Sequence, residues 1–292
     1  MLTLQQTAML RQSFIHIPSV GPVTERLIWQ SGVRSWDDCL ESSPPQLRAN
    51  LRSHLAEHVQ ESQRRLSQGD ARYFQMLLGS SHLWRLYSDF RRRVVYLDIE
   101  TTGLSFGFDD ITVIGLYDGT STRSFVLGEN LDDFAREISR YSLVVTFNGA
   151  CFDLPFLRTR FPGFDSSLAH LDLRYLLKRL GYSGGLKRIE RELGLDRPGA
   201  LRELDGYCAV LLWKKHLQGR RGALDTLLRY NLEDVVNLER LVQLAYNSML
   251  ASVPIPVERL EPNERPALPY RHDEGLIGEV VAEASRNPYG QR

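Results

Sequence analysis

Two acidic residues stand on one predicted β-strand, an arrangement that calls for a compensating positive charge. Residues 94–103 read VVYLDIETTG, mostly apolar, with Asp98 and Glu100 at alternate positions. Residues two apart on a strand face the same side, so the two carboxylates point together. Acidic residues are depleted in strands, and neighbouring carboxylates repel each other and lose hydration when buried. A divalent cation such as Mg²⁺ or Mn²⁺ between them would explain the pair, whereas two solvated acids at a strand end are the alternative.

A third acidic residue follows a second apolar segment. Residues 143–148 (LVVTFN) predict a buried strand, and a glycine turn after it leads into a predicted helix that starts near Asp153. A carboxylate there could join Asp98 and Glu100 around a cation, or it could complement the positive end of the helix dipole. The local sequence leaves these two roles equally open.

A long amphipathic helix, predicted over Ala223–Leu250, carries the last acidic candidate. Its apolar residues recur at helical spacing and form one stripe: Leu224, Leu228, Val235, Leu238 and Val242. Tyr230 and Asp234 are four residues apart, so they share a face on the flank of that stripe. Glu233 is predicted on the opposite, solvated side and is therefore excluded as a ligand. Asn231 projects near the centre of the stripe, where it needs a hydrogen-bond partner.

Together these residues form three short motifs: Asp98-x-Glu100, then Asn148-x4-Asp153, then Tyr230-x3-Asp234. The pattern resembles that of the DnaQ-like 3′–5′ exonucleases, which belong to the ribonuclease H-like superfamily. That family has two branches, which differ in whether a His or a Tyr precedes the last Asp. Arg229 stands where the His would be and Tyr230 where the Tyr would be. The chain therefore resembles the DEDDy branch, and within it the bacterial YprB-like group, over about residues 93–247.

The resemblance implies a reaction and a set of roles. It implies hydrolysis of nucleic-acid phosphodiester bonds from the 3′ end, with two Mg²⁺ or Mn²⁺ ions and water oriented by Tyr230. The metal ligands would be Asp98, Glu100, Asp153 and Asp234. Nucleic-acid contacts would come from residues around the motifs, namely Thr101, Gly103, Leu104, Asn148 and Phe152. The alternative function is a non-catalytic or structure-specific nucleic-acid binding protein on a nuclease fold, and DNA and RNA are not distinguished.

The order of predicted elements divides the chain into four parts. A helical, helix-hairpin-helix-like segment at 1–60 is followed by a helical connector at 61–92, a ribonuclease H-like exonuclease domain at 93–250 and an extended or partly disordered tail at 251–292. Within the third part we expect strands at 111–117, 123–127 and 168–173, and helices at 131–141, 173–180 and 206–217. The fold class is therefore α/β, a mixed β-sheet of three mostly antiparallel strands and then parallel ones, flanked by helices.

Two glycine-containing turns are candidate phosphate contacts. Ser19-Val20-Gly21-Pro22 lies between a predicted helix at 4–13 and another that starts at Pro22, and it resembles a helix-hairpin-helix motif with Ser19 in place of the first glycine. Gly21 is expected to bring backbone amides close to phosphate, where a side chain would crowd the approach and disfavour any positive φ. A helical hairpin with a purely structural or a protein-docking role is the equal alternative. Lys187, after the Gly184-Gly185 turn, is a further candidate, with an ordinary surface turn as the alternative.

Composition limits the class of protein. The chain has 292 residues, 42% hydrophobic and 25% charged, as in globular proteins. Three cysteines without a zinc-like spacing predict neither a disulfide framework nor a zinc site. No apolar run approaches the roughly 20 residues that span a membrane, and the first eleven residues lack the apolar core of a signal peptide. We therefore expect a cytoplasmic protein with no membrane contact.

Positive charge is concentrated in one region although the net charge is zero. Residues 140–222 contain 15 Lys and Arg against 8 Asp and Glu, an excess of seven. A basic region beside an acidic metal site suits a nucleic-acid partner, because cations bind the phosphate backbone. Several separate solvated helix faces would give the same count, and the sequence does not decide between the two.

Overall fold

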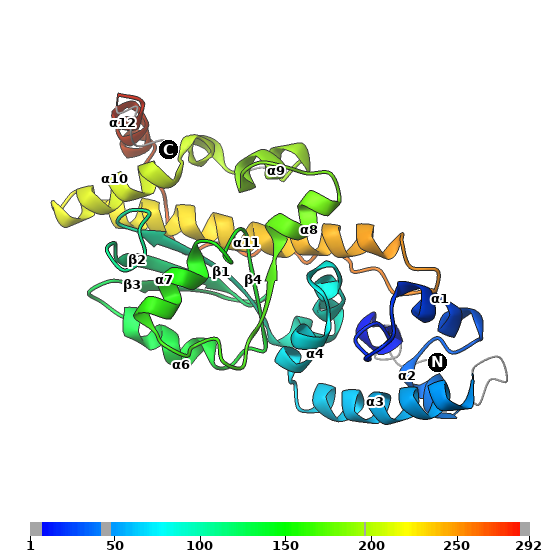
Figure 1. Ribbon diagram of the computed structural model, residues 1–292. Coiled ribbons are helices and arrows are strands. Elements are labelled where there is room, and N and C mark those ends of the chain that lie inside the picture. Colours follow the sequence, from blue (N-terminus) through cyan, green and yellow to red (C-terminus); the bar gives the residue numbers. More distant parts are fainter. Residues whose placement is uncertain (1–7, 42–47, 196, 287–292) are drawn as a thin grey trace.

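A mixed five-stranded β-sheet forms the centre of the larger part of the chain (Figure 1). The computed structural model describes residues 8–41, 48–195 and 197–286. In spatial order the strands are β3 (Thr122–Val126), β2 (Ile111–Tyr117), β1 (Val94–Thr101), β4 (Leu143–Thr146) and β5 (Ala169–Asp172). The pairs β1–β2 and β2–β3 are antiparallel, and the pairs β1–β4 and β4–β5 are parallel. The predicted α/β layout is confirmed.

Helices cover both faces of the sheet, with α6 and α7 on one face and α8, α10 and α11 on the other (Figure 1). Their bounds are α6 Phe134–Ile138, α7 Asp153–Arg160, α8 Leu173–Arg179, α9 Leu186–Glu192, α10 Gly206–Leu217 and α11 Ala223–Leu250. The predicted limits of α10 and α11 are confirmed. The helix predicted at 131–141 is split into a 3₁₀ turn at Leu131–Asp133 and the short α6.

Alternation along β1 decides which side chains enter which layer. Val95, Leu97 and Ile99 pack with the apolar residues of α6 and α7. The even-numbered residues of β1 face the opposite side, toward α11. Asp98 and Glu100 are among them, so both carboxylates point to the same side, as predicted, and that side is the layer between the sheet and α11.

The C-terminal segment is not wholly extended, which corrects the prediction for 251–292. A further helix, α12, spans Glu274–Ser285 and packs on α10 (Figure 1). The Asp273 carboxylate caps it by accepting a hydrogen bond from the backbone N–H of Leu276 at 3.0 Å. Leu276 and Ile277 are fully buried. Six of the twelve residues of α12 are apolar, but the prolines before it dominated the pattern of the segment.

A mainly helical part precedes the sheet. It contains α1 (Pro22–Gln30), α2 (Trp36–Glu41), α3 (Ala49–Ser67), α4 (Ala71–Leu77) and α5 (Tyr87–Phe90), with 3₁₀ turns at Leu10–Gln12, Ser80–Leu86 and Arg91–Arg93. Of the helix predicted at 4–13, residues 4–7 lie outside the described ranges. The described part contains a 3₁₀ turn at Leu10–Gln12. α1 begins at Pro22 as predicted, whereas α3 crosses the boundary that we expected at residue 60.

The turn before α1 has a different backbone from the one expected. Gly21 has φ −93° and ψ 179°, an extended conformation open to any residue, and a Cβ placed on it would meet nothing within 4 Å. Ser19 is the left-handed residue of the turn, with φ 66°. The idea that Gly21 is needed for a positive φ is therefore wrong, because that role falls on Ser19.

A buried ion pair connects α1 to the 3₁₀ turn at Ser80–Leu86. Glu25 accepts hydrogen bonds from the Ser13 hydroxyl and from the backbone N–H groups of Phe14 and Ile15, at 2.8–3.1 Å. The Arg85 guanidinium lies 2.7 Å from the same carboxylate oxygen, and both side chains are almost fully buried. The helical part is thus held around one enclosed charge pair.

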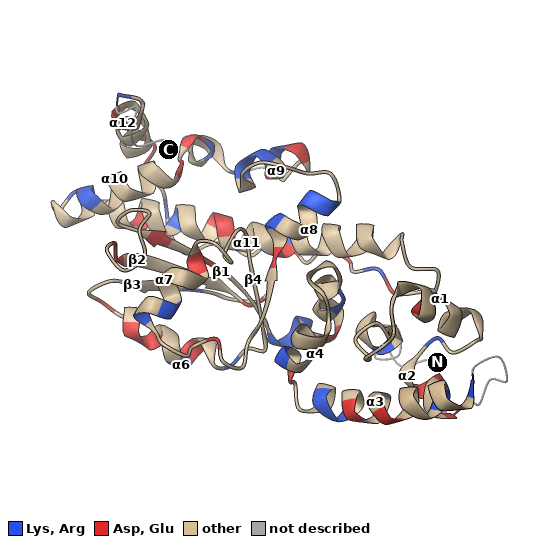
Figure 2. Cartoon of the chain, viewed as in Figure 1, with Lys and Arg blue, Asp and Glu red and all other residues tan. Residues whose placement is uncertain are grey.

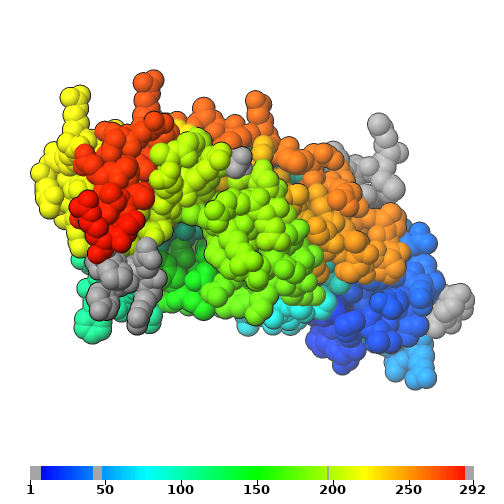
Figure 3. Space-filling view, turned by 90° about the horizontal axis from the view of Figure 1, so that it is seen from above, coloured from blue at the N-terminus to red at the C-terminus, as the bar shows by residue number. Residues whose placement is uncertain are grey.

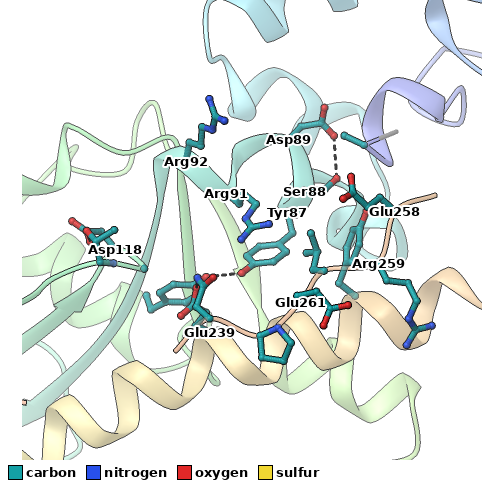
Figure 4. A pocket seen from close by; sticks show the side chains of 18 of the residues that line it. Tyr87, Ser88, Asp89, Arg91, Arg92, Asp118, Glu239, Glu258, Arg259 and Glu261 are labelled. Atoms are coloured by element: carbon teal, nitrogen blue, oxygen red, sulfur yellow. Dashed lines mark hydrogen bonds between the residues drawn. The ribbon is translucent and has the colours of Figure 1, made fainter. Parts of the chain in front are cut away.

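A cavity of about 830 Å³ lies at the start of β1 (Figure 4). Its wall includes the hydroxyls of Tyr87 and Tyr96, which are 2.6 Å apart, and Glu239 of α11. Arginines and carboxylates both surround it, so its charge is mixed. Asp98 and Glu100 lie toward the opposite end of β1, so this cavity is separate from them.

We expect Arg85→Met to destabilise the fold by about 3–5 kcal/mol, because Glu25 would remain buried without its counter-charge. Urea unfolding followed by far-ultraviolet circular dichroism measures the loss. Arg136→Met is the control, since Arg136 pairs with Asp133 on the surface with 80% of its side chain exposed. An unchanged midpoint for Arg85→Met would mean that the three hydrogen bonds to Glu25 suffice by themselves.

Candidate active site

Three carboxylates from two elements converge in the layer between the sheet and α11. One oxygen each from Asp98, Glu100 and Asp234 can be chosen so that all three lie within 4.8 Å of one another. β1 supplies the first two and α11 the third. Anionic oxygen donors at this spacing form a group that could hold a divalent cation.

A buried amide fixes the first of these acids. Asn231 of α11 donates a hydrogen bond from its side chain to Asp98 Oδ2 at 2.9 Å, and it lies 3.3 Å from the backbone oxygen of Asp98. Its close approach depends on Gly115 in β2, where a Cβ would stand 1.9 Å from the Asn231 side-chain oxygen. Asn231, whose partner the sequence did not reveal, therefore positions a carboxylate.

Asp153 lies next to this group as the first residue of α7. Its side chain is almost fully buried, and its Oδ1 atom has no hydrogen-bond partner among the described residues. It is not among the three acids that lie within 4.8 Å of one another, but its charge raises the pKa of Asp98. An unpaired buried carboxylate oxygen facing the other acids favours a ligand role over a purely capping one.

Burial and mutual repulsion make the acids weak. Loss of hydration, followed by the charge of Asp234, raises the pKa of Asp98 and of Glu100 well above the ordinary carboxyl range. Burial also raises the pKa of Asp153 to about 7. The group is therefore a strong attractor for cations or protons.

Lys187 lies in α9, just after the exposed Gly184-Gly185 turn, and its charge interacts with those of Asp234 and Glu100. Its ammonium nitrogen lies 4.4 Å from the ring centroid of Tyr230 and is buried without a hydrogen-bond partner among the described residues. Burial lowers its pKa, while the charges of Asp234 and Glu100 raise it. Tyr230 itself is buried, and burial, then the charge of Asp234, raises its pKa well above the usual value.

Arg197 is a functional candidate that the sequence analysis missed. It is 4% exposed and forms an ion pair with Asp234. It also donates two hydrogen bonds to the buried Glu190 of α9, at 2.7 and 2.8 Å. Asn237 of α11 donates to the same carboxylate at 2.8 Å. No local pattern marks Arg197, because its partners come from two helices that only the tertiary fold brings together.

Glu233 is not solvated, which corrects the expectation that it faces solvent. It is fully buried and forms ion pairs with Arg229 at 2.8 Å and with Arg265 of the C-terminal segment. The chain after α11 folds back over that side of the helix, a contact that the helix pattern alone cannot predict. Its exclusion from the three-acid group still stands.

The predicted nucleic-acid contacts fall in several environments. Thr101 is buried and donates to the backbone oxygen of Gly103, whereas Leu104 is 68% exposed. Asn148 adopts a left-handed backbone with φ 65°, and Asp172 holds the turn by accepting hydrogen bonds from the amides of residues 148 and 150, at 2.8 and 3.0 Å. Asp172 is thereby committed to backbone amides. Phe152 lies half-buried before Asp153, and Gly21 lies in the separate N-terminal helical part (Figure 1).

A hollow in the surface is bordered by the green segments of α7, α8 and α9 and by the yellow-green segment near residue 200 (Figure 3). These are the elements that carry Asp153 and Lys187. The basic residues of 140–222 are distributed over several helices, α7 to α10 among them (Figure 2). The positive charge of this region is therefore spread over several helices, and part of it is paired with acids outside the site.

A family model for the RNase H superfamily (RNase_H_2) matches residues 95–246, more than half of the chain. The chain belongs to the RNase H superfamily. The matched range contains all four acids and Tyr230. A search of the curated proteins found no match.

Solved structures give fold-level similarities. Nuclease NrnC of Brucella melitensis with bound Mg²⁺ is 18% identical with a TM-score of 0.39, over 68% of this chain and 83% of that one. The Nibbler EXO domain of Aedes aegypti is 14% identical with a TM-score of 0.35, over 68% and 90%. The family B DNA polymerase of Pyrobaculum calidifontis is 17% identical with a TM-score of 0.41, over 54% of this chain, which spans only 24% of the polymerase.

Among the described residues, no helix has the length and apolar character needed to cross a membrane. The largest apolar surfaces of the helices instead pack against the sheet or against one another.

We expect Mn²⁺ to raise the melting temperature by several degrees at pH 8 and by little at pH 5. The pKa of Asp153 rises on folding from 3.8 to about 7, so between those values the folded state binds more protons than the unfolded state. Without metal, stability is therefore lost as the pH rises through this window. A cation that binds the ionised carboxylates offsets that loss.

Differential scanning fluorimetry with Mn²⁺ or EDTA across pH 5–8 measures this effect. In Asp98→Asn the shift at pH 8 should be much smaller, because one anionic ligand is gone. An equal Mn²⁺ effect at both pH values would contradict metal binding by these acids.

Proposed function

We propose that this protein is a metal-dependent nuclease of the DEDDy type, a 3′–5′ exonuclease most similar to the bacterial YprB-like group. The observation that carries the proposal is the convergence of Asp98, Glu100 and Asp234 within 4.8 Å, with the buried Asp153, whose Oδ1 atom has no hydrogen-bond partner among the described residues, interacting with Asp98 and Asp234 by charge. Such a group is costly for a fold unless a cation uses it. Membership of the RNase H superfamily agrees with a nuclease fold.

Two Mg²⁺ or Mn²⁺ ions would be held by Asp98, Glu100, Asp153 and Asp234. The residues fit such ions because all four donors are anionic oxygens and because burial, together with the charges of neighbouring acids, raises the pKa values of Asp98, Glu100 and Asp153. When bound, divalent ions of this kind stabilise the charge of a phosphodiester transition state and make water more acidic. Asn231 keeps Asp98 in place by its hydrogen bond.

Tyr230 would orient the attacking water rather than take its proton. Burial and the charge of Asp234 raise the pKa of the phenol well above its usual value, so the hydroxyl stays protonated at neutral pH. A protonated hydroxyl donates one hydrogen bond and can accept another, which suits it to hold a water molecule in place. Lys187, packed on the other side of the ring, limits how the phenol can turn.

The N-terminal hairpin would add nucleic-acid affinity without sequence preference, or it would recruit a protein partner. α1 begins after Gly21, and its first side chains Val23 and Thr24 are exposed or half-exposed, which leaves the helix start accessible. Binding to phosphate there would be salt-sensitive and indifferent to base identity. If the protein bound nucleic acid through this hairpin but did not cleave it, the alternative function of a non-catalytic binding protein would hold.

End-labelled DNA and RNA oligomers, incubated with the protein and either Mn²⁺ or EDTA, test the function directly. We expect a ladder that shortens from the 3′ end with Mn²⁺ and none with EDTA. Asp98→Asn should abolish it while the protein stays folded, since the substitution removes an anionic ligand and keeps the side-chain size. Asp225→Asn, at an exposed position on the first turn of α11, is the matched control. Binding without cleavage by the unaltered protein would favour the non-catalytic alternative.

Tyr230→Phe should slow cleavage by about 10²–10⁴-fold, the usual effect of removing a positioned acid–base group, with metal binding nearly unchanged. The ring that packs against Lys187 is retained, so the fold should not change. Tyr246→Phe, at a second buried tyrosine of α11 that lines the separate cavity, is the control and should keep full activity. Loss of Mn²⁺ binding in Tyr230→Phe would show that the phenol belongs to the ligand shell instead.

A further inference from the structure

The exposed face of α8 carries positive charge that no acid compensates. The arginines of α7 and the Lys215 ammonium of α10 form ion pairs with acids. Helix α8, in contrast, has the sequence LRYLLKR, which contains three cations and no acid (Figure 2). Arg174 and Lys178 are exposed, and neither has an acidic partner among the described residues. Positive charge in this state attracts anions from solution.

Helix α8 begins beside the acids. It follows β5, which is parallel to β4, and β4 is parallel to β1, so the carboxyl ends of these three strands lie at one edge of the sheet. Asp98 and Glu100 lie toward that edge. The Arg174 guanidinium donates a hydrogen bond to the side-chain oxygen of Asn148, in the turn that leads to Asp153. The first turn of α8 therefore borders the acidic site.

The last turn of α8 lies against the N-terminal helical part. Arg179 donates a hydrogen bond to the backbone oxygen of Ser81, in the 3₁₀ turn at Ser80–Leu86. Arg174 and Lys178 are four residues apart, so they share one face of the helix with Cβ atoms about 5–6 Å apart. Exposed positive charge therefore continues from the acidic site toward the part of the chain that carries the hairpin.

We propose that the exposed face of α8 is a phosphate track, formed by Arg174 and Lys178, for the backbone of a nucleic-acid strand. The inference rests on the proposed nuclease function: with the 3′ end of the strand at the acids, the track holds phosphates on the 5′ side of that end. Cations bind phosphate without reading base identity, so the track accepts any sequence. It favours strands that are long enough to leave the acidic site and reach α8.

The salt dependence of binding tests the track separately from cleavage. Asp98→Asn in the full chain prevents turnover, and the probes are a fluorescein-labelled oligothymidylate of about 20 nucleotides and a labelled thymidine dinucleotide. Fluorescence anisotropy at several KCl concentrations gives the slope of log K against log [KCl], which counts the phosphates that the protein neutralises. Adding Lys178→Gln should reduce the slope for the long strand by about 0.7, the value for one phosphate of a single strand.

Three comparisons accompany this variant. Binding of the dinucleotide should not change in Lys178→Gln, because the dinucleotide does not extend beyond the acids. Arg136→Gln is the matched control and should leave the slope unchanged, since it removes an exposed positive charge from α6, on the other face of the sheet. Arg174→Gln should reduce the slope for the long strand as Lys178→Gln does, whereas Arg174→Lys, which keeps the charge, should restore it.

An unchanged slope in Lys178→Gln would overturn the track and leave α8 as a solvated face. Equal losses of affinity for the dinucleotide and the long strand would also overturn it, because the lysine would then act on the acidic site itself. Failure of the nuclease proposal is a different result, since it would appear as absence of Mn²⁺-dependent cleavage by the unaltered protein. An intact cleavage ladder together with an unchanged slope would refute the track alone.

Discussion

Like charges enclosed together are the constraint on which the rest of this structure depends. Asp98, Glu100 and Asp234 lie within 4.8 Å of one another in a largely buried layer between the sheet and α11. Taking carboxylates out of water is unfavourable, and placing them side by side adds repulsion. The fold can hold them only because rigid elements keep them from separating. β1 is the middle strand of the sheet, paired on both sides, and α11 spans 28 residues across it.

Several residues outside the acidic group have a structural role that depends on it, because they position the acids or pair with them. Gly115 leaves room on β2 for Asn231, and Asn231 in turn holds Asp98. Arg197 pairs with Asp234 and is itself held by Glu190, which α9 brings against α11. The helix α9 and the segment that follows it therefore supply the positive charge, from Lys187 and Arg197, that partly neutralises the acids. Removal of any one of these hydrogen bonds or ion pairs would leave a buried charge or amide without a partner.

The sequence was sufficient wherever a contact depends on residues close together in the chain. Alternation along β1 predicted that Asp98 and Glu100 face the same side, and helical spacing placed Tyr230 and Asp234 on one face. It failed where distant segments meet. Glu233 was expected in solvent because the helix pattern shows no apolar neighbours on its side, yet Arg265 returns from the C-terminal segment to cover it. The pairing of Arg197 with Asp234 could not be predicted for the same reason, since a single arginine before a proline has no local pattern that indicates its partner.

The formal charges of the buried side chains around the site can be added up and compared with the charge of a metal ion and of a phosphodiester. Five carboxylates face one another around the site, namely Asp98, Glu100, Asp153, Asp234 and Glu190. Two buried cations, Lys187 and Arg197, face them. Three negative charges therefore remain uncompensated, while the nearby Asp172 is taken up by backbone amides. One divalent ion would leave the site anionic and repel a phosphodiester. Under the proposed function, two would leave a single positive charge, equal in size and opposite in sign to the charge of one phosphodiester.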